Sequence, residues 1–290
     1  MDGGPEESGT ATTPGGVTAA DARELISSVG VWYHVIDLGG GLVTPGWFDL
    51  RPIVEKMPWP DVTGKRCLDV GPWDGFLSFE LERRGAASVL AVDIGDAADW
   101  DWRLDLRVSG PAAMAGGGST KTGRGFEVAK ELLGSGVERR ELSVYDLSPE
   151  QVGSFDVVVC GSLMLHLKNP IGALEAIRSV CSGHFLSAEQ IDPALTAMRR
   201  GGAAARFAGG ENGQWWIVNS HGHRRLVAAA GFDIERTTKP YAIPLGSSHH
   251  HAGEKARPRE RLQQLTDRLI VGGYGVPHAA LLARPGRIEG

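Results

Sequence analysis

Two kinds of apolar pattern alternate along the chain. Short runs of consecutive apolar residues, bounded by glycine or charged residues, predict strands that are buried on both faces. Between them lie segments in which apolar residues recur every three or four positions, a spacing typical of amphipathic helices. The runs that predict strands are 66–71, 88–94, 140–147, 155–163, 183–191, 232–240 and 278–285. The segments that predict helices are 20–29, 76–85, 126–134, 169–181, 221–232 and 258–271.

This alternation predicts an α/β fold, a doubly wound and mostly parallel sheet of seven strands in a Rossmann-like arrangement, with insertions near the N-terminus and late in the chain. Parallel neighbours need crossover connections, and a helix after most strands provides them in the usual right-handed sense. The helix ends support these boundaries, since Pro170 stands in the first turn of one helix and Gly85 and Gly231 stop two others.

The same pattern divides the chain into three parts. Residues 1–20 consist mainly of small and polar residues without apolar periodicity, which predicts a disordered tail. Residues 21–60 predict a short helix and an aromatic-rich loop that pack on the core. Residues 61–290 are expected to form the main domain, with an insertion near 193–214.

Composition excludes several classes of protein. The chain has 290 residues, of which 42% are hydrophobic, so it can bury a large core. Its formal net charge of −5 gives no general attraction to nucleic acids or anionic membranes. It has no run of roughly 18 apolar residues that would predict a membrane span, and its acidic start does not resemble a signal peptide. We therefore expect a cytoplasmic protein in which Cys67, Cys160 and Cys181 stay reduced.

Two conspicuous local patterns are not expected to form sites. His249, His250 and His251 are consecutive in a polar loop, so their side chains diverge and no metal site is predicted. The Gly-rich stretch 116–122 lacks a glycine before Lys121 and does not follow a buried strand. It is therefore not interpreted as a phosphate-binding loop.

The first predicted strand leads into a glycine-containing turn, which reads Asp-Val-Gly-Pro-Trp-Asp-Gly over 69–75. In open parallel sheets, ligands bind beyond the carboxyl ends of the strands. Gly71 and Gly75 would let the backbone pass close to such a ligand. Asp93 ends the second strand 22 residues after Gly71, where an acid can accept hydrogen bonds from both hydroxyls of a ribose. Asp146 follows the third strand and is placed to meet an adenine amino group.

A dinucleotide-binding enzyme is the first alternative. Its Gly-x-Gly-x-x-Gly pattern requires glycine where this chain has Trp73 and Phe76. Because a tryptophan would block the close approach of a pyrophosphate, the sequence disfavours a nicotinamide or flavin cofactor.

The order of these elements resembles that of class I methyltransferases. An Asp-x-Gly-x-x-x-Gly turn, an acid after the second strand and Tyr-Asp-Leu after the third follow one another over about residues 60–190. The resemblance implies S-adenosylmethionine as the cofactor and methyl transfer as the activity. The residues expected to bind the cofactor are Asp69, Gly71, Trp73, Gly75, Asp93, Tyr145, Asp146 and Ser162.

Four stretches are similar to a narrower family, the tRNA mo5U34 methyltransferase-like proteins. They are 32–52, 67–76, 141–147 and 161–170. The related wobble-uridine enzyme uses carboxy-S-adenosylmethionine and carries Tyr-His-Arg-Arg where this chain has Leu-His-Leu-Lys at 165–168. Because Leu165 and Leu167 cannot bind an extra carboxylate, we expect ordinary S-adenosylmethionine.

His166 is the candidate general base, because it follows the fourth strand and an unperturbed histidine has a pKa near ~6.5. A histidine that only holds the loop through a backbone hydrogen bond is the alternative. The candidate residues for binding the acceptor are Trp32, Tyr33, His34, Trp215 and Trp216. Each has a structural alternative, since these side chains would also serve to pack the N-terminal segment and the insertion on the core.

The leading function is methyl transfer to a small molecule, such as a specialised metabolite, bound between the irregular segments 31–52, 100–125, 163–168 and 193–220. A tRNA wobble-uridine methyltransferase is the main alternative, and a cofactor-binding protein without transfer activity is the third. The one basic grouping is Arg199, Arg200, Arg206, Arg224 and Arg225. A solvated face is the expected role of these arginines, and an RNA phosphate patch is the alternative.

Overall fold

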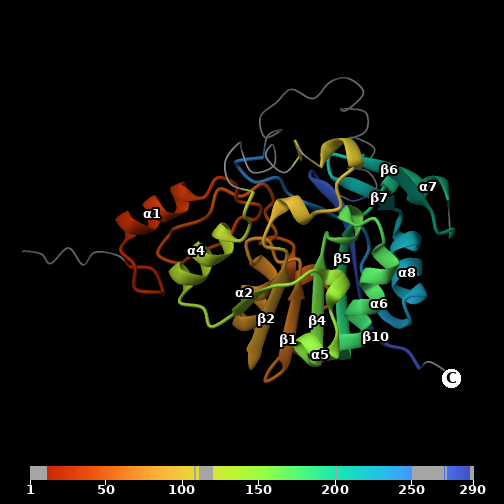
Figure 1. The fold of residues 1–290 in the computed structure, drawn as a ribbon, viewed down its shortest axis with the longest axis horizontal. Helices are drawn as coiled ribbons and strands as arrows, with labels where there is room; N and C mark the ends of the chain where they lie inside the picture. Colours follow the sequence, from red (N-terminus) through yellow and green to blue (C-terminus); the bar gives the residue numbers. More distant parts are fainter. Residues whose placement is uncertain are drawn as a thin grey trace, which may run out of the picture.

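The protein is built around an eight-stranded mixed sheet with helices on both faces (Figure 1). The computed structural model describes residues 12–107, 109–110, 120–199, 201–249, 271 and 273–287. The strands of the sheet are β1 (Arg66–Val70), β2 (Ser88–Asp93), β3 (Glu138–Glu141), β4 (Phe155–Gly161), β5 (Cys181–Gln190), β8 (Phe232–Thr237), β9 (Tyr241–Ile243) and β10 (Val276–Pro285).

The strand order is β3-β2-β1-β4-β5-β10-β8, and β9 pairs with β10. Neighbours among β1 to β5 run parallel, whereas β10 runs antiparallel to β5, β8 and β9. The order reverses between β1 and β4, which leaves a ligand crevice at the carboxyl ends of these strands. The predicted Rossmann-like α/β fold is therefore confirmed, with the short strand β9 added to the seven expected.

Most of the helices begin at a capping side chain. The α-helices are α1 (Ala19–Ser28), α2 (Phe76–Arg83), α4 (Arg124–Leu133), α5 (Pro149–Val152), α6 (Pro170–Val180), α7 (Pro193–Met198) and α8 (Ser220–Ala229). The side chains of Ser148, Asn169, Asp192 and Asn219 each accept a backbone N–H in the first turn of the following helix. These bonds satisfy donors that a helix cannot pair internally.

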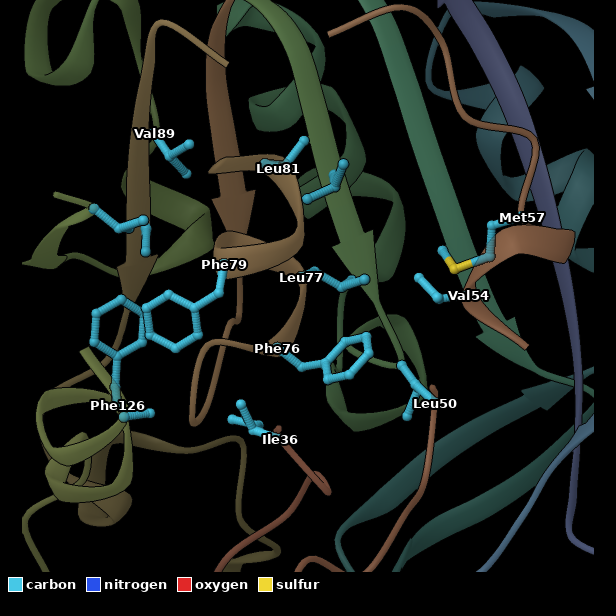
Figure 2. Close-up of a cluster of buried hydrophobic side chains, with 14 of the residues drawn as sticks. Ile36, Leu50, Val54, Met57, Phe76, Leu77, Phe79, Leu81, Val89 and Phe126 are labelled. Atoms are coloured by element: carbon cyan, nitrogen blue, oxygen red, sulfur yellow. The ribbon is translucent and has the colours of Figure 1, made fainter. Parts of the chain in front are cut away.

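Two apolar clusters fill the space on either face of the sheet. Successive strand residues point to opposite faces, so Val159 of β4 joins one cluster and Val158 joins the other. The first cluster combines side chains of the N-terminal segment, α2 and α4, and it includes the adjoining rings of Phe79 and Phe126 (Figure 2). The second cluster combines side chains of α6 and α8 with the other face of the sheet.

The third strand is shorter than predicted. It ends at Glu141, and Val144–Asp146 form a single 3-10 turn. The hydroxyl of Ser143 accepts the backbone N–H of Tyr145 and caps this turn, which ends the extended backbone. The prediction of a strand over 140–147 is therefore right only for 140–141, and the strand begins earlier, at Glu138.

The insertion folds as α7 followed by an antiparallel hairpin of β6 (Ala205–Glu211) and β7 (Gln214–Val218). The sequence did not predict this hairpin. Its turn uses Asn212 and Gly213, both with positive φ, and its register is irregular near the glycines. Apart from Val271, the predicted helix 258–271 lies outside the described residues, as do His250, His251, Arg200 and residues 116–119.

Part of the expected tail packs on α4. Thr13 is buried, and the backbone N–H of Gly15 donates to the carbonyl of Leu132 at 2.9 Å. The prediction of a disordered tail over 1–20 is therefore wrong for residues 12–18, and α1 begins at Ala19. Apolar periodicity missed this contact because it is made by the backbone. Residues 1–11 lie outside the described residues.

Gly75 is expected to reject a side chain because of packing. Its φ is +91°, and a Cβ there would lie 2.6 Å from the ring of Phe79 and 2.8 Å from that of Phe126. Gly75→Ala should therefore lower the free energy of unfolding through overpacking, by about 1–3 kcal/mol beyond the backbone effect. Urea denaturation measures this loss.

Gly64→Ala is the matched control. Gly64 also has a positive φ, +67°, but no atom lies within 4 Å of the added Cβ. The control should show only the cost of the left-handed backbone, about 1–2 kcal/mol. Equal losses in the two variants would contradict the packing role of Gly75.

Candidate functional site

A cavity lies at the carboxyl ends of β1, β4 and β5. Its open space, counted out to bulk solvent, is about 800 Å³. The floor includes Asp69, Gly71 and Ser162, and the far wall includes Tyr241 and His278. The cavity therefore lies at the switch in strand order, where the fold predicts a ligand.

The N-terminal segment forms the roof of the cavity. Tyr33, Phe48, Leu50 and Met57 line it from this segment. Figure 2 shows Leu50 and Met57 on the same side of the cluster as Phe76 of α2. The roof is thus continuous with the apolar core through Leu50 and Met57.

A buried carboxylate joins this roof to the glycine turn. Asp74 is fully buried, and its Oδ2 accepts the backbone N–H groups of Tyr33 and His34 at 2.8 Å each. Its Oδ1 pairs with Nδ1 of His34. Sequence reasoning missed Asp74, although an acid inside a buried turn must find donors and was a signal for such a partner.

The glycine turn itself is closely bonded. Gly71 has a φ of +74° and lines the cavity. Asp69, at the end of β1, accepts the hydroxyl of Ser78 at 2.6 Å, and burial raises the pKa of Asp69 to about 7. Gly75 faces the two phenylalanine rings and not the cavity, so its missing side chain serves packing.

Asp93 lies beside this turn at the end of β2. Its carboxylate accepts the backbone N–H of Trp73 at 3.1 Å and that of Ile94 at 2.9 Å. Burial raises the pKa of Asp93 to about 6. The two hydrogen bonds fix the orientation of the carboxylate at the strand end, as a group that binds vicinal hydroxyls requires.

Trp73, Tyr145 and Asp146, which the sequence predicted to bind the cofactor, lie outside the cavity lining. Trp73 packs at a tilt between Tyr33 and Trp100, with ring centroids 5.7 and 5.4 Å away. Tyr145 donates its hydroxyl to Asp101 at 2.7 Å. Asp146 is exposed beyond the strand end.

The five predicted acceptor-binding residues separate into two groups. Tyr33 and His34 line the cavity. Trp32 is buried in the core and donates its indole N–H to the carbonyl of Ile26 at 3.0 Å. Trp215 and Trp216 donate theirs to backbone carbonyls at 2.7 and 3.3 Å. None of these three tryptophans lines the cavity, which matches their structural alternative.

His166 lines the cavity in its neutral form. Its Nδ1 lies 2.8 Å from the carbonyl of Gly213, in the turn of the hairpin. Because a carbonyl only accepts, Nδ1 carries the proton and Nε2 keeps its lone pair. Burial lowers the pKa of His166. The hairpin thus fixes the tautomer of this histidine.

A second neutral histidine, His278, was not predicted. Its Nδ1 donates to the carbonyl of Val276 at 2.9 Å, so its Nε2 accepts the hydroxyl of Ser162 at 2.8 Å. Burial lowers the pKa of His278 to about 4. The sequence placed His278 only at the start of a buried strand, and its polar ring there was the available signal.

Glu189 holds the loop that follows β4. It is buried, and its Oε1 accepts the backbone N–H groups of Leu163 and Met164 at 3.2 Å each. Burial raises the pKa of Glu189 to about 8. The loop that carries Ser162 and His166 is therefore fixed from beneath by a carboxyl group that sequence reasoning missed.

Other kinds of site find no support in the described part of the chain. Cys67, Cys160 and Cys181 are free and buried. Among the described residues, no three His, Cys, Asp or Glu side chains are grouped to hold a metal ion. None of the described helices is long and apolar enough to cross a membrane.

The sequence of the chain matches the model of a family described as a methyltransferase domain, over residues 49–237. The chain belongs to this family. The assignment confirms the predicted class, a methyltransferase.

Curated relatives match a smaller part. The chain is 29% identical over 147 residues to a ubiquinone biosynthesis O-methyltransferase of Acinetobacter baumannii, covering 46% of this chain and 52% of that protein. It is 27% identical over 132 residues to the Pseudomonas aeruginosa protein of the same name, covering 44% and 45%. The chain thus spans about half the length of the curated relatives it matches.

Among solved structures, the N-terminal domain of EvdMO1 with SAH bound is similar at a TM-score of 0.50 and 14% identity. The likeness covers 92% of this chain and 96% of that domain. At this identity it supports the fold alone.

The bond between Asp74 and the roof is expected to be needed for stability. Asp74→Ala leaves the N–H groups of Tyr33 and His34 unpaired, and it should cost about 3–5 kcal/mol of unfolding free energy. Asp74→Asn keeps one accepting oxygen and should cost less. Denaturation gives the energies, and limited proteolysis within residues 31–57 reports release of the roof. Wild-type proteolysis in Asp74→Ala would contradict this role.

Proposed function

We propose that the protein transfers a methyl group from S-adenosylmethionine to a small molecule bound in the cavity. One observation carries the proposal: a single cavity extends from the glycine turn, at Asp69 and Gly71, to His166 under the N-terminal roof. A site that binds the donor at one end and an acceptor at the other brings both into reacting distance. Such positioning contributes roughly 7–11 kcal/mol to catalysis.

The residues present fit the cofactor. Gly71 exposes backbone to the cavity without a side chain on its own Cα, and Asp93 presents an oriented carboxylate one strand away. We assign Asp93 to the ribose hydroxyls and the turn at Asp69 and Gly71 to the methionine part. When bound, the sulfonium cofactor supplies an activated methyl group. The role of the protein is then to orient the acceptor and to exclude water.

His166 is assigned as the proton acceptor. It is neutral, lines the cavity and carries a lone pair on Nε2, because the hairpin binds the proton on Nδ1. A neutral imidazole can remove a proton from an acceptor hydroxyl or amine as the nucleophile attacks. The O-methyltransferase name of the curated relatives agrees with an oxygen nucleophile.

Ordinary S-adenosylmethionine and a small acceptor are favoured over the wobble-uridine reaction. Leu165 lines the cavity and Leu167 is buried in the second apolar cluster, so neither offers a partner to an extra carboxylate. The roof over the cavity favours a compact acceptor. Arg199, Arg206, Arg224 and Arg225 are exposed and lie outside the cavity lining, in keeping with a solvated face.

Cofactor affinity is expected to depend on Asp93 and on pH. Since ribose hydroxyls donate to the carboxylate, binding favours its deprotonated form. Affinity should therefore be full above the pKa of Asp93, about 6, and fall as the pH drops through that value. Asp93→Asn should weaken binding by roughly 1.5–3 kcal/mol at neutral pH and remove this part of the pH dependence. Calorimetry with S-adenosylmethionine measures both.

Asp61→Asn, an exposed change before β1, is the control and should keep wild-type affinity and pH dependence. Unchanged affinity in Asp93→Asn would refute the ribose assignment.

Methyl transfer is expected to label small molecules and to require His166. The protein is incubated with S-adenosylmethionine labelled in the methyl group and a cell extract divided into small-molecule and RNA fractions. The label should enter the small-molecule fraction. His166→Asn keeps a donor for Gly213 but has no basic nitrogen, so it should reduce the rate by about 10²–10⁴-fold with unchanged cofactor affinity.

His184→Asn provides the control, because His184 lies at the opposite end of the sheet and pairs with Glu235. It should label at the wild-type rate. Label in tRNA would mean that the acceptor class is wrong, and a full rate in His166→Asn would exclude His166 as the base.

A further inference from the structure

One wall of the cavity carries a row of polar side chains from three strands. His278 of β10 pairs in register with Gln190 of β5 on one side and with Tyr241 of β9 on the other. All three residues line the cavity. The rings of Tyr241 and His278 are nearly parallel, with centroids 6.3 Å apart. We call Gln190, His278 and Tyr241 the polar row.

The hydroxyl of Tyr241 has no partner within the described part of the chain. The residue is only 6% exposed, and no donor or acceptor among the described residues reaches its oxygen. A buried hydroxyl without a hydrogen bond costs about 1–3 kcal/mol. A hydroxyl that borders a cavity regains this energy when a ligand atom binds to it.

The polar row is uncharged at neutral pH. Burial raises the pKa of Tyr241, so the phenol keeps its proton and remains a donor. His278 is held neutral, with one nitrogen bonded to Val276 and the other to the hydroxyl of Ser162. The row therefore offers hydrogen bonds from Tyr241 and Gln190 without a formal charge, and His278 holds the wall between them.

The rest of the lining disfavours an anion. No Lys or Arg stands among the described residues that line the cavity. A buried acid, Asp69, lines the cavity instead. Bringing a carboxylate or phosphate into this environment costs desolvation without a compensating partner.

We propose that the polar row binds an uncharged oxygen substituent of the acceptor, a hydroxyl or a carbonyl, while the atom to be methylated faces His166. The acceptor is then an uncharged and largely apolar molecule with at least two polar substituents. Its apolar part contacts Phe48, Met57 and Ile243, which line the remaining surface. This inference rests on the proposed function and adds the chemical class of the acceptor.

The test uses the full chain saturated with S-adenosylhomocysteine and three sets of probes. The first set is catechol, resorcinol and hydroquinone, which carry two hydroxyls at different spacings. The second is phenol, which lacks one of them, and the third is the corresponding dihydroxybenzoates, which add a carboxylate. Calorimetry gives the dissociation constants in the wild type, in Tyr241→Phe and in Tyr274→Phe. Tyr274 is exposed and does not line the cavity, so it is the matched control.

At least one dihydroxybenzene should bind about tenfold more tightly than phenol, which corresponds to about 1.4 kcal/mol. Tyr241→Phe should remove this advantage and leave phenol binding unchanged, whereas Tyr274→Phe should have no effect. The dihydroxybenzoates should bind more weakly than their uncharged parents.

Two outcomes would overturn the inference: tighter binding of a dihydroxybenzoate, or no gain over phenol that depends on Tyr241. The affinity for S-adenosylhomocysteine is measured in the same samples. If the cofactor product does not bind, the proposed function fails. If it binds normally and the gain is absent, only the acceptor class is wrong.

Discussion

The site depends on one buried carboxylate. Asp74 is fully buried, and three donors surround it: two backbone N–H groups and the imidazole of His34. Because Asp74 belongs to the same turn as Gly71, the segment that roofs the cavity is bonded directly to the turn that forms its floor. A buried carboxylate is costly unless its donors are all in place. Roof and floor are therefore one cooperative structure.

A segment from early in the chain and a segment from late in the chain meet at this roof. The backbone N–H of Asp49 donates to the carbonyl of Pro244 at 2.9 Å, and Phe48 forms a bridge with Leu245. β9 precedes these residues and pairs with β10, which lies antiparallel beside β5. The antiparallel strand thus brings a wall from late in the chain against a roof from its beginning. A fold with only parallel crossovers would leave this side of the crevice open.

Local sequence patterns predicted the features that depend on neighbouring residues, namely the strands, the glycine turn and the acid at a strand end. The run ending in Asp69 and Gly71 and the acid at Asp93 were placed correctly relative to the sheet, because strands, turns and their spacing are short-range features. The predicted end of β3 was wrong for a local reason too. The apolar pattern continues to residue 147, but the cap at Ser143 starts a 3-10 turn and ends the strand earlier.

Local sequence patterns could not predict the contacts of the remaining site residues, because these contacts are made with residues far away in the sequence. Ser162 and His278 are 116 positions apart and Asp74 and His34 are 40 apart. Apolar periodicity reports only that such residues are buried. Trp215 and Trp216 show the converse: the sequence named them as acceptor candidates with a structural alternative, and their indole N–H groups donate to backbone carbonyls outside the cavity lining.

Two of the three histidines that line the cavity, His166 and His278, are alike in one respect and differ in another. In both, Nδ1 donates to a backbone carbonyl and burial lowers the pKa, so both rings are neutral with a lone pair on Nε2. The lone pair of His278 is already engaged by the hydroxyl of Ser162. Protonating His278 would reverse that bond and place a charge in a site with low dielectric constant. His278 is consequently suited to hold Ser162 and the wall in place. The Nε2 of His166, by contrast, has no hydrogen-bond partner among the described residues, so its lone pair is free to accept a proton.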